Sequence, residues 1–202
     1  MKIVKHEFVN EIIIEKSRFI TYLFRVNDID EANKHIADIK KRHWDANHNC
    51  VALIIGTHGE IMRSSDDGEP SKTAGIPMLE VLKKNNITNT LAITTRYFGG
   101  IKLGAGGLVR AYSKSVSDAI KKANFIEIRI LKQYQLKSTY SYHTIVENLL
   151  KEKTNLLDII YSDIITYIFA INDESILDKL SDITLGKAEI TYQGEISVDV
   201  DV

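Results

Sequence analysis

The spacing of apolar and polar positions predicts alternating strands and helices in the first half of the chain. Residues 18–26 are rich in aromatic and β-branched side chains, which is typical of a strand. Asp28 and Asp30 then precede apolar residues at helical spacing that continues to Arg42, so a helix with acids at its start and bases at its end is expected. Residues 49–56 predict a short buried strand that ends at a glycine.

The same pattern continues around a run of glycines. A polar loop is predicted at residues 64–75, and Pro77 suits the first turn of a short helix. Residues 89–98 predict another strand, a glycine loop follows at residues 99–107, and the apolar positions from Leu108 to Ala123 have helical spacing. The glycine loop therefore lies between a strand and a helix.

The second half has a regular rhythm of six elements. The pattern predicts strand, helix, two strands joined by a tight turn near Ser162 and Asp163, a second helix and a closing strand. This order, β-α-β-β-α-β, is the split βαβ or ferredoxin-like plan. We therefore expect an α+β protein with domains at residues 1–127 and 128–202.

Composition limits the classes of function. The chain has 202 residues, 44% apolar, and a net charge of −1, so it has enough apolar residues for a core and no overall charge that attracts a polyanion. One cysteine excludes an intrachain disulfide, the longest purely apolar run is residues 51–55, and no signal peptide is evident. We expect a cytoplasmic protein that does not bind membranes.

The glycine run is the main candidate for a binding site. Glycines between a strand and a helix let backbone N–H groups approach an anion at the positive end of the helix dipole. No acidic residue occurs from Lys83 to Ser117, although several bases do. The candidate residues for binding an anion or RNA are Arg96, Tyr97, Gly99, Gly100, Lys102, Gly104, Gly106, Gly107, Arg110 and Lys114.

Familiar loop motifs do not fit this run, and a purely structural role stays open. The segment lacks the Gly-Lys-Ser/Thr ending of a P-loop, and Val109 stands where the dinucleotide fingerprint has a glycine. In a purely structural role, the glycines would only form a bend with positive φ angles or allow close helix–strand packing. Phe98 or Tyr97 could add stacking to a nucleobase, or both rings could belong to the core.

A second polar loop supplies possible partners for the glycine run. Asp66, Asp67 and Glu69 are carboxylates that could hold Mg²⁺, with Lys72 and Thr73 beside them, although Asp-Gly and Glu-Pro are also ordinary turn chemistry. Because the two loops carry opposite charges, we expect them to face each other across a cleft.

His48 and Cys50 stand two residues apart on one strand. They fall short of a zinc site, so we expect no metal and a buried, inert thiol at Cys50. We expect His48 to be hydrogen-bonded in or near the core, and it is a further possible partner of the glycine run in the cleft. We expect no cofactor, except Mg²⁺ if the protein is an enzyme.

Long runs of sequence carry a family resemblance. Residues 65–82, "SDDGEPSKTAGIPMLEVL", and residues 94–113, "TTRYFGGIKLGAGGLVRAYS", resemble the signature of the YigZ/IMPACT family. "EKSRFITYL" and "DANHNCVALIIG" resemble its other blocks, so the resemblance runs from about residue 15 to residue 115.

The resemblance implies folds for both halves. For the first domain it implies the fold of the second domain of a small-subunit ribosomal protein, which is shared with elongation factor G and the GHMP kinases. For the second domain it implies a ferredoxin-like domain similar to those of elongation factor G.

The resemblance also implies a link to translation and stress. Eukaryotic IMPACT proteins restrain an initiation-factor kinase through an additional RWD domain, for which this chain leaves no room, so that mechanism is not carried over. Fold analogy alone does not establish a function.

Three functions remain open. The first is a non-catalytic regulator that binds RNA, the ribosome or another polyanion through the glycine-rich basic patch. The second is an enzyme acting on a phosphorylated small molecule, with Gly104–Gly107 around the phosphate and Mg²⁺ on the acidic loop. The third is a protein-interaction module whose glycines are structural. We favour the first, without catalysis.

Overall fold

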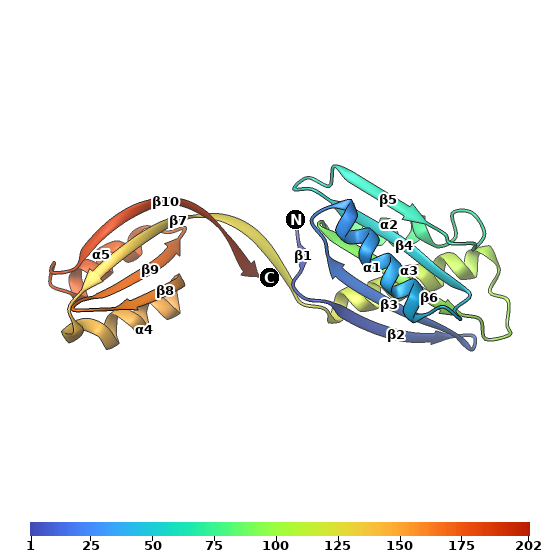
Figure 1. Cartoon of the computed structure of the whole chain (residues 1–202), viewed down its shortest axis with the longest axis horizontal. Coiled ribbons are helices and arrows are strands. Elements are labelled where there is room, and N and C mark those ends of the chain that lie inside the picture. Colours follow the sequence, from blue (N-terminus) through green and yellow to red (C-terminus); the bar gives the residue numbers. More distant parts are fainter. The chain divides into compact units, whose positions relative to one another are not determined.

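The computed structural model describes residues 1–202, which form a mixed α/β protein of two compact units (Figure 1). The first unit contains Met1–Glu127 with Asp201–Val202, and the second contains Ile128–Val200. None of the helices combines the length and apolar character needed to cross a membrane.

The first unit is built around an antiparallel sheet with the strand order β2-β3-β6-β4-β5. Its elements are β1 (Ile3–Val4), β2 (Phe8–Ile14), β3 (Ser17–Arg25), α1 (Ile29–Arg42), β4 (His48–Ile55), β5 (Ile61–Ser65), α2 (Gly75–Lys84), β6 (Thr90–Tyr97) and α3 (Gly104–Lys122). β1 pairs with the first residues of β7 (Phe125–Ser138), which also belong to this unit.

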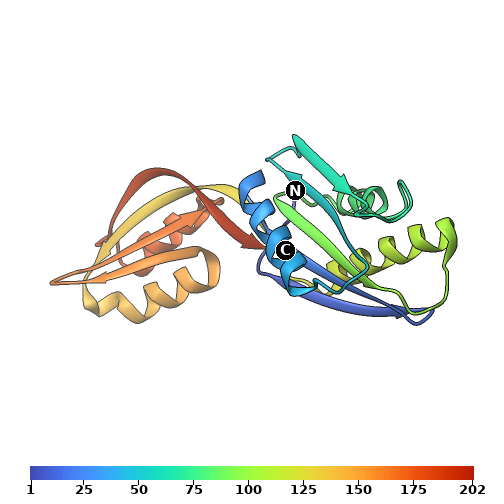
Figure 2. The same cartoon turned by 45° about the vertical axis from the view of Figure 1, so that its right-hand side comes forward.

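Helices cover both faces of this sheet. α1 packs on one face over Ile20, Tyr22 and Leu53, and α2 and α3 pack on the other over Leu23 and Ile54. Figures 1 and 2 show α1 on one side of the sheet and α2 and α3 on the opposite side. Because successive strand residues point to opposite faces, β3, β4 and β6 contribute to both cores.

Several elements of this unit form where the sequence predicts them. α1 begins where Asp28 accepts a hydrogen bond from the backbone N–H of Glu31 at 2.8 Å, and it ends on Lys40, Lys41 and Arg42. β3, β4 and β6 are also confirmed within one residue of their predicted bounds, and Pro77 lies in the first turn of α2 as predicted.

Two features differ from the predicted pattern. The edge strand β5 was missed because all five of its residues are exposed and show no alternation. The glycine loop predicted at residues 99–107 ends early, since α3 already begins at Gly104. Gly104, Gly106 and Gly107 therefore belong to the first turn of a helix, which a sequence pattern with so many glycines does not reveal.

The second unit has the predicted order β-α-β-β-α-β. Its elements are the rest of β7, a 3₁₀ turn at Tyr140–Tyr142, α4 (His143–Lys153), β8 (Asn155–Tyr161), β9 (Ile165–Ile171), α5 (Ser175–Ile183) and β10 (Glu189–Asp201). β7 and β8 both pair antiparallel with β9, and β10 pairs with β7. A separate core forms among Leu136, Val146, Phe169 and Leu180.

The segment between the two predicted domains is part of a strand. β7 starts at Phe125 and runs without interruption past Ile130. The last two residues of the chain belong to the first unit, where the N–H of Val202 donates to the carbonyl of Phe125 at 3.1 Å.

Candidate functional site

The register of three strands gathers the first residues of the site. Arg96 of β6 stands directly opposite Phe19 of β3 and opposite His48 of β4. Directly paired residues share one face of a sheet, so these three side chains form a row on the face covered by α2 and α3. This row is the floor of the site.

Arg96 is buried in that row and is not a surface base. Its side chain is 7% exposed, one terminal nitrogen donates to Glu69 Oε1 at 2.7 Å, and the other donates to Ser17 Oγ at 3.3 Å. The guanidinium carbon lies 5.4 Å from the centre of the Phe19 ring and 5.7 Å from that of Phe98. The prediction of Arg96 as part of an exposed patch is wrong, because β6 is a central strand and Glu69 covers this position.

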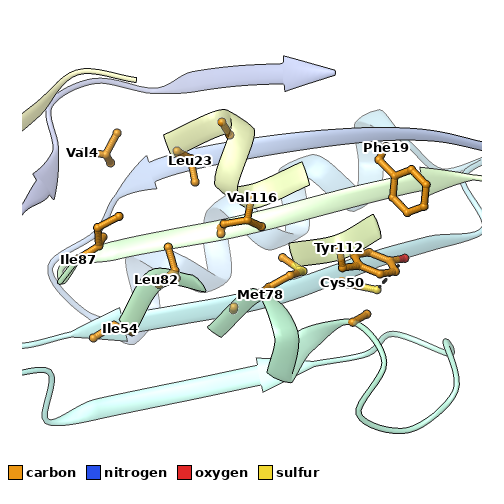
Figure 3. Packing of buried hydrophobic residues seen from close by; sticks show 14 of the residues in the cluster. Val4, Phe19, Leu23, Cys50, Ile54, Met78, Leu82, Ile87, Tyr112 and Val116 are labelled. Atoms are coloured by element: carbon orange, nitrogen blue, oxygen red, sulfur yellow. Dashed lines mark hydrogen bonds between the residues drawn. The ribbon is translucent and has the colours of Figure 1, made fainter. Parts of the chain in front are cut away.

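Glu69 joins the floor to α3. Its Oε1 atom also accepts a hydrogen bond from the Tyr112 hydroxyl at 2.8 Å, and Tyr112 Oη lies 3.3 Å from Cys50 Sγ. Figure 3 shows Cys50 and Tyr112 side by side in the core, with Phe19 near the Tyr112 ring. A buried carboxylate with a buried arginine and a phenol around it is a firmly held structural group.

The Cys50 thiol is buried and unreactive, as the sequence predicts. Burial raises the pKa of its thiol to about 12, so the thiolate that would act as a nucleophile does not form near neutral pH. Burial likewise raises the pKa of Tyr112.

The carboxylate of Asp66 holds its own loop together. One of its oxygens accepts from the N–H groups of Ala74 and Gly75, and the other accepts from the N–H of Lys72 at 2.8 Å. Burial alone would raise the pKa of Asp66, but these three donors hold it below its usual value. Asp66 therefore fixes the start of α2.

Asp67 and His48 also stabilise this loop. The two carboxylate oxygens of Asp67 accept from Lys40 Nζ at 2.6 Å and from the N–H of Asn49 at 2.7 Å. His48 Nδ1 lies 2.9 Å from the carbonyl of Asp67, and His48 Nε2 lies 3.8 Å from Glu69 Oε2.

Thr73 and Lys72 complete the loop. The Thr73 hydroxyl donates to the carbonyl of Pro70 at 2.6 Å, and Lys72 is exposed. Of the three acidic residues in the loop, Glu69 alone lines the cavity described next.

A cavity of about 280 Å³ lies between the acidic loop (residues 64–75) and the glycine segment (residues 99–107). We call it the Phe98 cavity; it is lined by Glu69, Pro70, Arg96, Phe98, Lys102, Leu103, Gly104, Ala105 and Leu108. The two loops thus contribute to one concave surface. Most of its walls are apolar, and its floor carries the Glu69–Arg96 pair.

A second hollow of about 570 Å³ adjoins the same segment. We call it the basic hollow; it is lined by Ile14, Glu15, Ile101, Lys102, Leu103, Gly107, Arg110, Ala111 and Lys114. Lys102 and Leu103 line both hollows. Lys114 pairs with Asp118 at 2.7 Å, whereas Lys102 and Arg110 are exposed and form no ion pair.

The glycines of the segment serve different purposes. A Cβ at Gly99 would lie 2.0 Å from the backbone of Lys16, so that glycine is required by close packing. Gly100 and Gly104 have φ angles of 86° and 67°, which favour glycine. Gly106 has no such φ and meets only Arg110 at 3.5 Å, so no steric reason for a glycine exists there.

The start of α3 is open. No side chain caps this helix, and its first turn contains no acidic residue. Gly104, Ala105 and Gly106 are exposed, so the first N–H groups of the helix are available to a ligand.

Tyr97 does not belong to this surface. Its hydroxyl contacts His43 Nδ1 at 2.8 Å and donates to Asp45 at 3.1 Å, on the face of the sheet that α1 covers. The neighbouring Phe98 lines the cavity instead. Alternation of side chains along a strand places residues 96 and 98 on one face, so of the two rings considered for stacking, Phe98 is the one that reaches the cavity.

Comparisons with known proteins match almost the whole chain. Residues 15–120 match the family described as the Impact N-terminal domain. The IMPACT family member YvyE of Bacillus subtilis is 45% identical over 198 residues, which cover 96% of this chain and 91% of YvyE. The IMPACT family member YigZ of Escherichia coli is 39% identical over 139 residues, covering 68% of each chain.

A solved structure is also similar. A crystal structure described as that of a hypothetical protein superposes with a TM-score of 0.62 at 31% identity, covering 94% of this chain and 95% of the other.

Proposed function

Because this chain belongs to the IMPACT family, we propose that it is a non-catalytic regulator linked to translation or stress, which binds RNA, free or within the ribosome. Binding takes place at the start of α3, on a surface that we call the α3 basic face, formed by Lys102, Arg110 and Lys114. The family's link to translation supports the regulatory role, and the chemistry of this surface supports the polyanion.

One observation carries the proposal: Lys102 and Arg110 are exposed, form no ion pair, and line the same hollow beside the open first turn of α3. Surface bases in proteins commonly pair with nearby acids, as Lys114 does with Asp118. Two unpaired bases beside free helix N–H groups attract phosphate oxygens. Glu15, which lines the same hollow, weakens this attraction without cancelling it.

The spacing along the helix extends the surface. Arg110 and Lys114 lie four residues apart, so they share one side of α3 with the hollow. Several phosphates of one strand then contact the protein at once, which favours a polymer over a single phosphorylated molecule. The expected partner is single-stranded RNA or an exposed RNA segment of the ribosome.

The test is the salt dependence of binding to a single-stranded RNA. If the three bases of the α3 basic face each neutralise one phosphate, log affinity should fall with log salt at a slope of about −2. The triple variant Lys102→Ala, Arg110→Ala, Lys114→Ala should bind more weakly and bring the slope close to zero. Arg96 is left unchanged because its loss would disturb the fold.

A matched control removes the same charge from the opposite face of the sheet. Lys34, Lys41 and Arg42 are exposed bases of α1, and their alanine variant should bind RNA with the parent's slope. Equal slopes for the parent and the variant of the α3 basic face would rule out this surface.

The result of the same experiment also bears on the two remaining functions. If the parent binds no RNA at low salt, an enzyme acting on a phosphorylated small molecule becomes the better reading, and thermal stabilisation by nucleotides tests it. Asp66 and Asp67 accept hydrogen bonds from their own loop, β4 and α1, which argues against a Mg²⁺ site on the acidic loop. If neither ligand binds, an interaction module for protein partners is left.

A further inference from the structure

We propose that the Phe98 cavity receives one unstacked nucleobase of the bound RNA, while the first N–H groups of α3 hold an adjacent phosphate. This inference rests on the proposed function and makes it more specific, since it assigns a separate base-binding pocket next to the α3 basic face. It names the ligand as a nucleotide unit, with its ring and its phosphate in neighbouring subsites.

The walls and size of the cavity suit one ring system. Pro70, Phe98, Leu103 and Leu108 provide apolar surface around about 280 Å³, just below the usual range for pockets that bind drug-sized molecules. A flat base has two apolar faces and a polar edge. The apolar walls match the faces, and the Glu69–Arg96 floor lies where the edge would reach.

Phe98 is placed as a stacking platform. It is 46% exposed, although a large apolar ring gains from burial. Its backbone is held in place, because its N–H donates to Asn47 Oδ1 at 2.7 Å and the N–H of Gly99 donates to Ser17 Oγ at 3.2 Å, and the Arg96 guanidinium carbon lies 5.7 Å from the centre of its ring. A ring held at the rim of a cavity binds a base with little loss of conformational freedom.

The floor of the cavity contains polar atoms without partners. Arg96 Nε is buried and has no hydrogen-bond acceptor, which is rare in folded proteins. Glu69 Oε2 has no close donor, since His48 Nε2 is 3.8 Å away. Arg96 Nε is sealed from the cavity, but Glu69 lines it, so Glu69 Oε2 is a spare acceptor for an amino group on the edge of a base.

The phosphate subsite adjoins this pocket. Gly104 and Ala105 line the cavity and begin the uncapped helix, and Lys102 lines both the Phe98 cavity and the basic hollow. A base in the cavity therefore places its phosphate near the start of α3, and the chain of phosphates continues along Arg110. Gly106, for which packing gives no reason, leaves this approach open.

The experiment measures binding of a fluorescently labelled single-stranded RNA of twelve nucleotides and of inorganic polyphosphate, which has no bases. Phe98→Ala should weaken RNA binding about 5- to 150-fold with an unchanged salt slope. Ala105 is exposed and lines the cavity, so the larger side chain of Ala105→Leu should fill part of it and weaken RNA binding by a similar factor. Phe98→Trp should retain most of the affinity, and Phe98→Ala should leave polyphosphate binding unchanged.

Val109→Ala is the matched control, since this partly exposed residue of α3 lines neither hollow and its variant should bind RNA like the parent. Thermal unfolding of each variant checks the fold, and Ala105→Leu keeps the test decisive if Phe98→Ala unfolds.

The outcomes separate the two proposals. RNA binding that is salt-dependent but unchanged in Phe98→Ala and Ala105→Leu overturns the nucleobase pocket and leaves the α3 basic face intact. A parent that binds no RNA at low salt overturns both. If polyphosphate competes as well as RNA of equal charge, the cavity does not read bases, and an apolar side chain of a protein partner becomes its better occupant.

Discussion

Glu69 and Arg96 form the buried ion pair of the candidate site. Both side chains are almost fully buried, and Arg96 also contacts Ser17 while Glu69 also accepts from Tyr112. The pair connects the acidic loop, a central strand and α3. Removing one charge from a buried pair leaves the other uncompensated, which costs about 3–5 kcal/mol.

We therefore expect Glu69→Gln to lower the free energy of unfolding by about 3 kcal/mol. Glutamine keeps the size of the side chain and an acceptor for Tyr112, so the loss isolates the charge. The double variant Glu69→Leu, Arg96→Met should recover part of this stability. Urea unfolding of the parent and both variants measures the effect. A Glu69→Gln protein as stable as the parent would show that the pair is not coupled in this way.

At the scale of elements, the first turn of α3 combines poor helix formers with an open end. Three glycines occur among its first four residues, and no side chain caps it. Glycine destabilises a helix interior by about 1 kcal/mol relative to alanine. Gly104 has a positive φ that accounts for it, whereas Gly106 has none. The glycine at position 106 thus lowers stability and keeps the approach to the helix N–H groups free of a side chain.

Gly106→Ala should raise the free energy of unfolding by about 0.5 kcal/mol, because alanine loses less conformational entropy on forming the helix. The same variant should bind single-stranded RNA more weakly, since its Cβ stands where the phosphate approaches. Thermal unfolding and RNA titration measure the two effects. Ser117→Ala, farther along α3, is the control and should leave RNA binding unchanged. Higher stability with undiminished binding would argue against a phosphate at this turn.

At the scale of the whole molecule, the candidate site lies within the first unit. The second unit has its own core, in which Leu136, Val146, Tyr167 and Leu180 are fully buried. β7 belongs to both units because its first residues pair with β1. The second unit needs no residue of the first for its β-α-β-β-α-β order.

A fragment of residues 128–202 should therefore fold alone and show a cooperative thermal transition, although a chain of this size has a modest core. The fragment lacks the α3 basic face and should not bind RNA. Circular dichroism during heating and RNA titration test the two statements. A fragment that melts gradually, without a transition, would mean that the second unit depends on the first.

The sequence by itself determined most of the elements and the two halves of the protein. Local patterns are sufficient for this, since the spacing of apolar residues, Asp28 before α1 and the turn at Ser162 act through neighbouring residues. The family resemblance is also a property of the sequence. These signals located the glycine segment and the acidic loop as the regions of interest.

Only the tertiary structure decided what each residue of those regions does. Arg96 and Tyr97 are adjacent in the sequence, but one is buried against Glu69 and the other contacts His43 on the opposite face of the sheet. Sequence patterns report charge and period, whereas burial depends on which strand is central and which loop covers it. The division of the bases into buried Arg96 and exposed Lys102 and Arg110 therefore required the packed sheet, because contacts between distant residues set the burial of each charge.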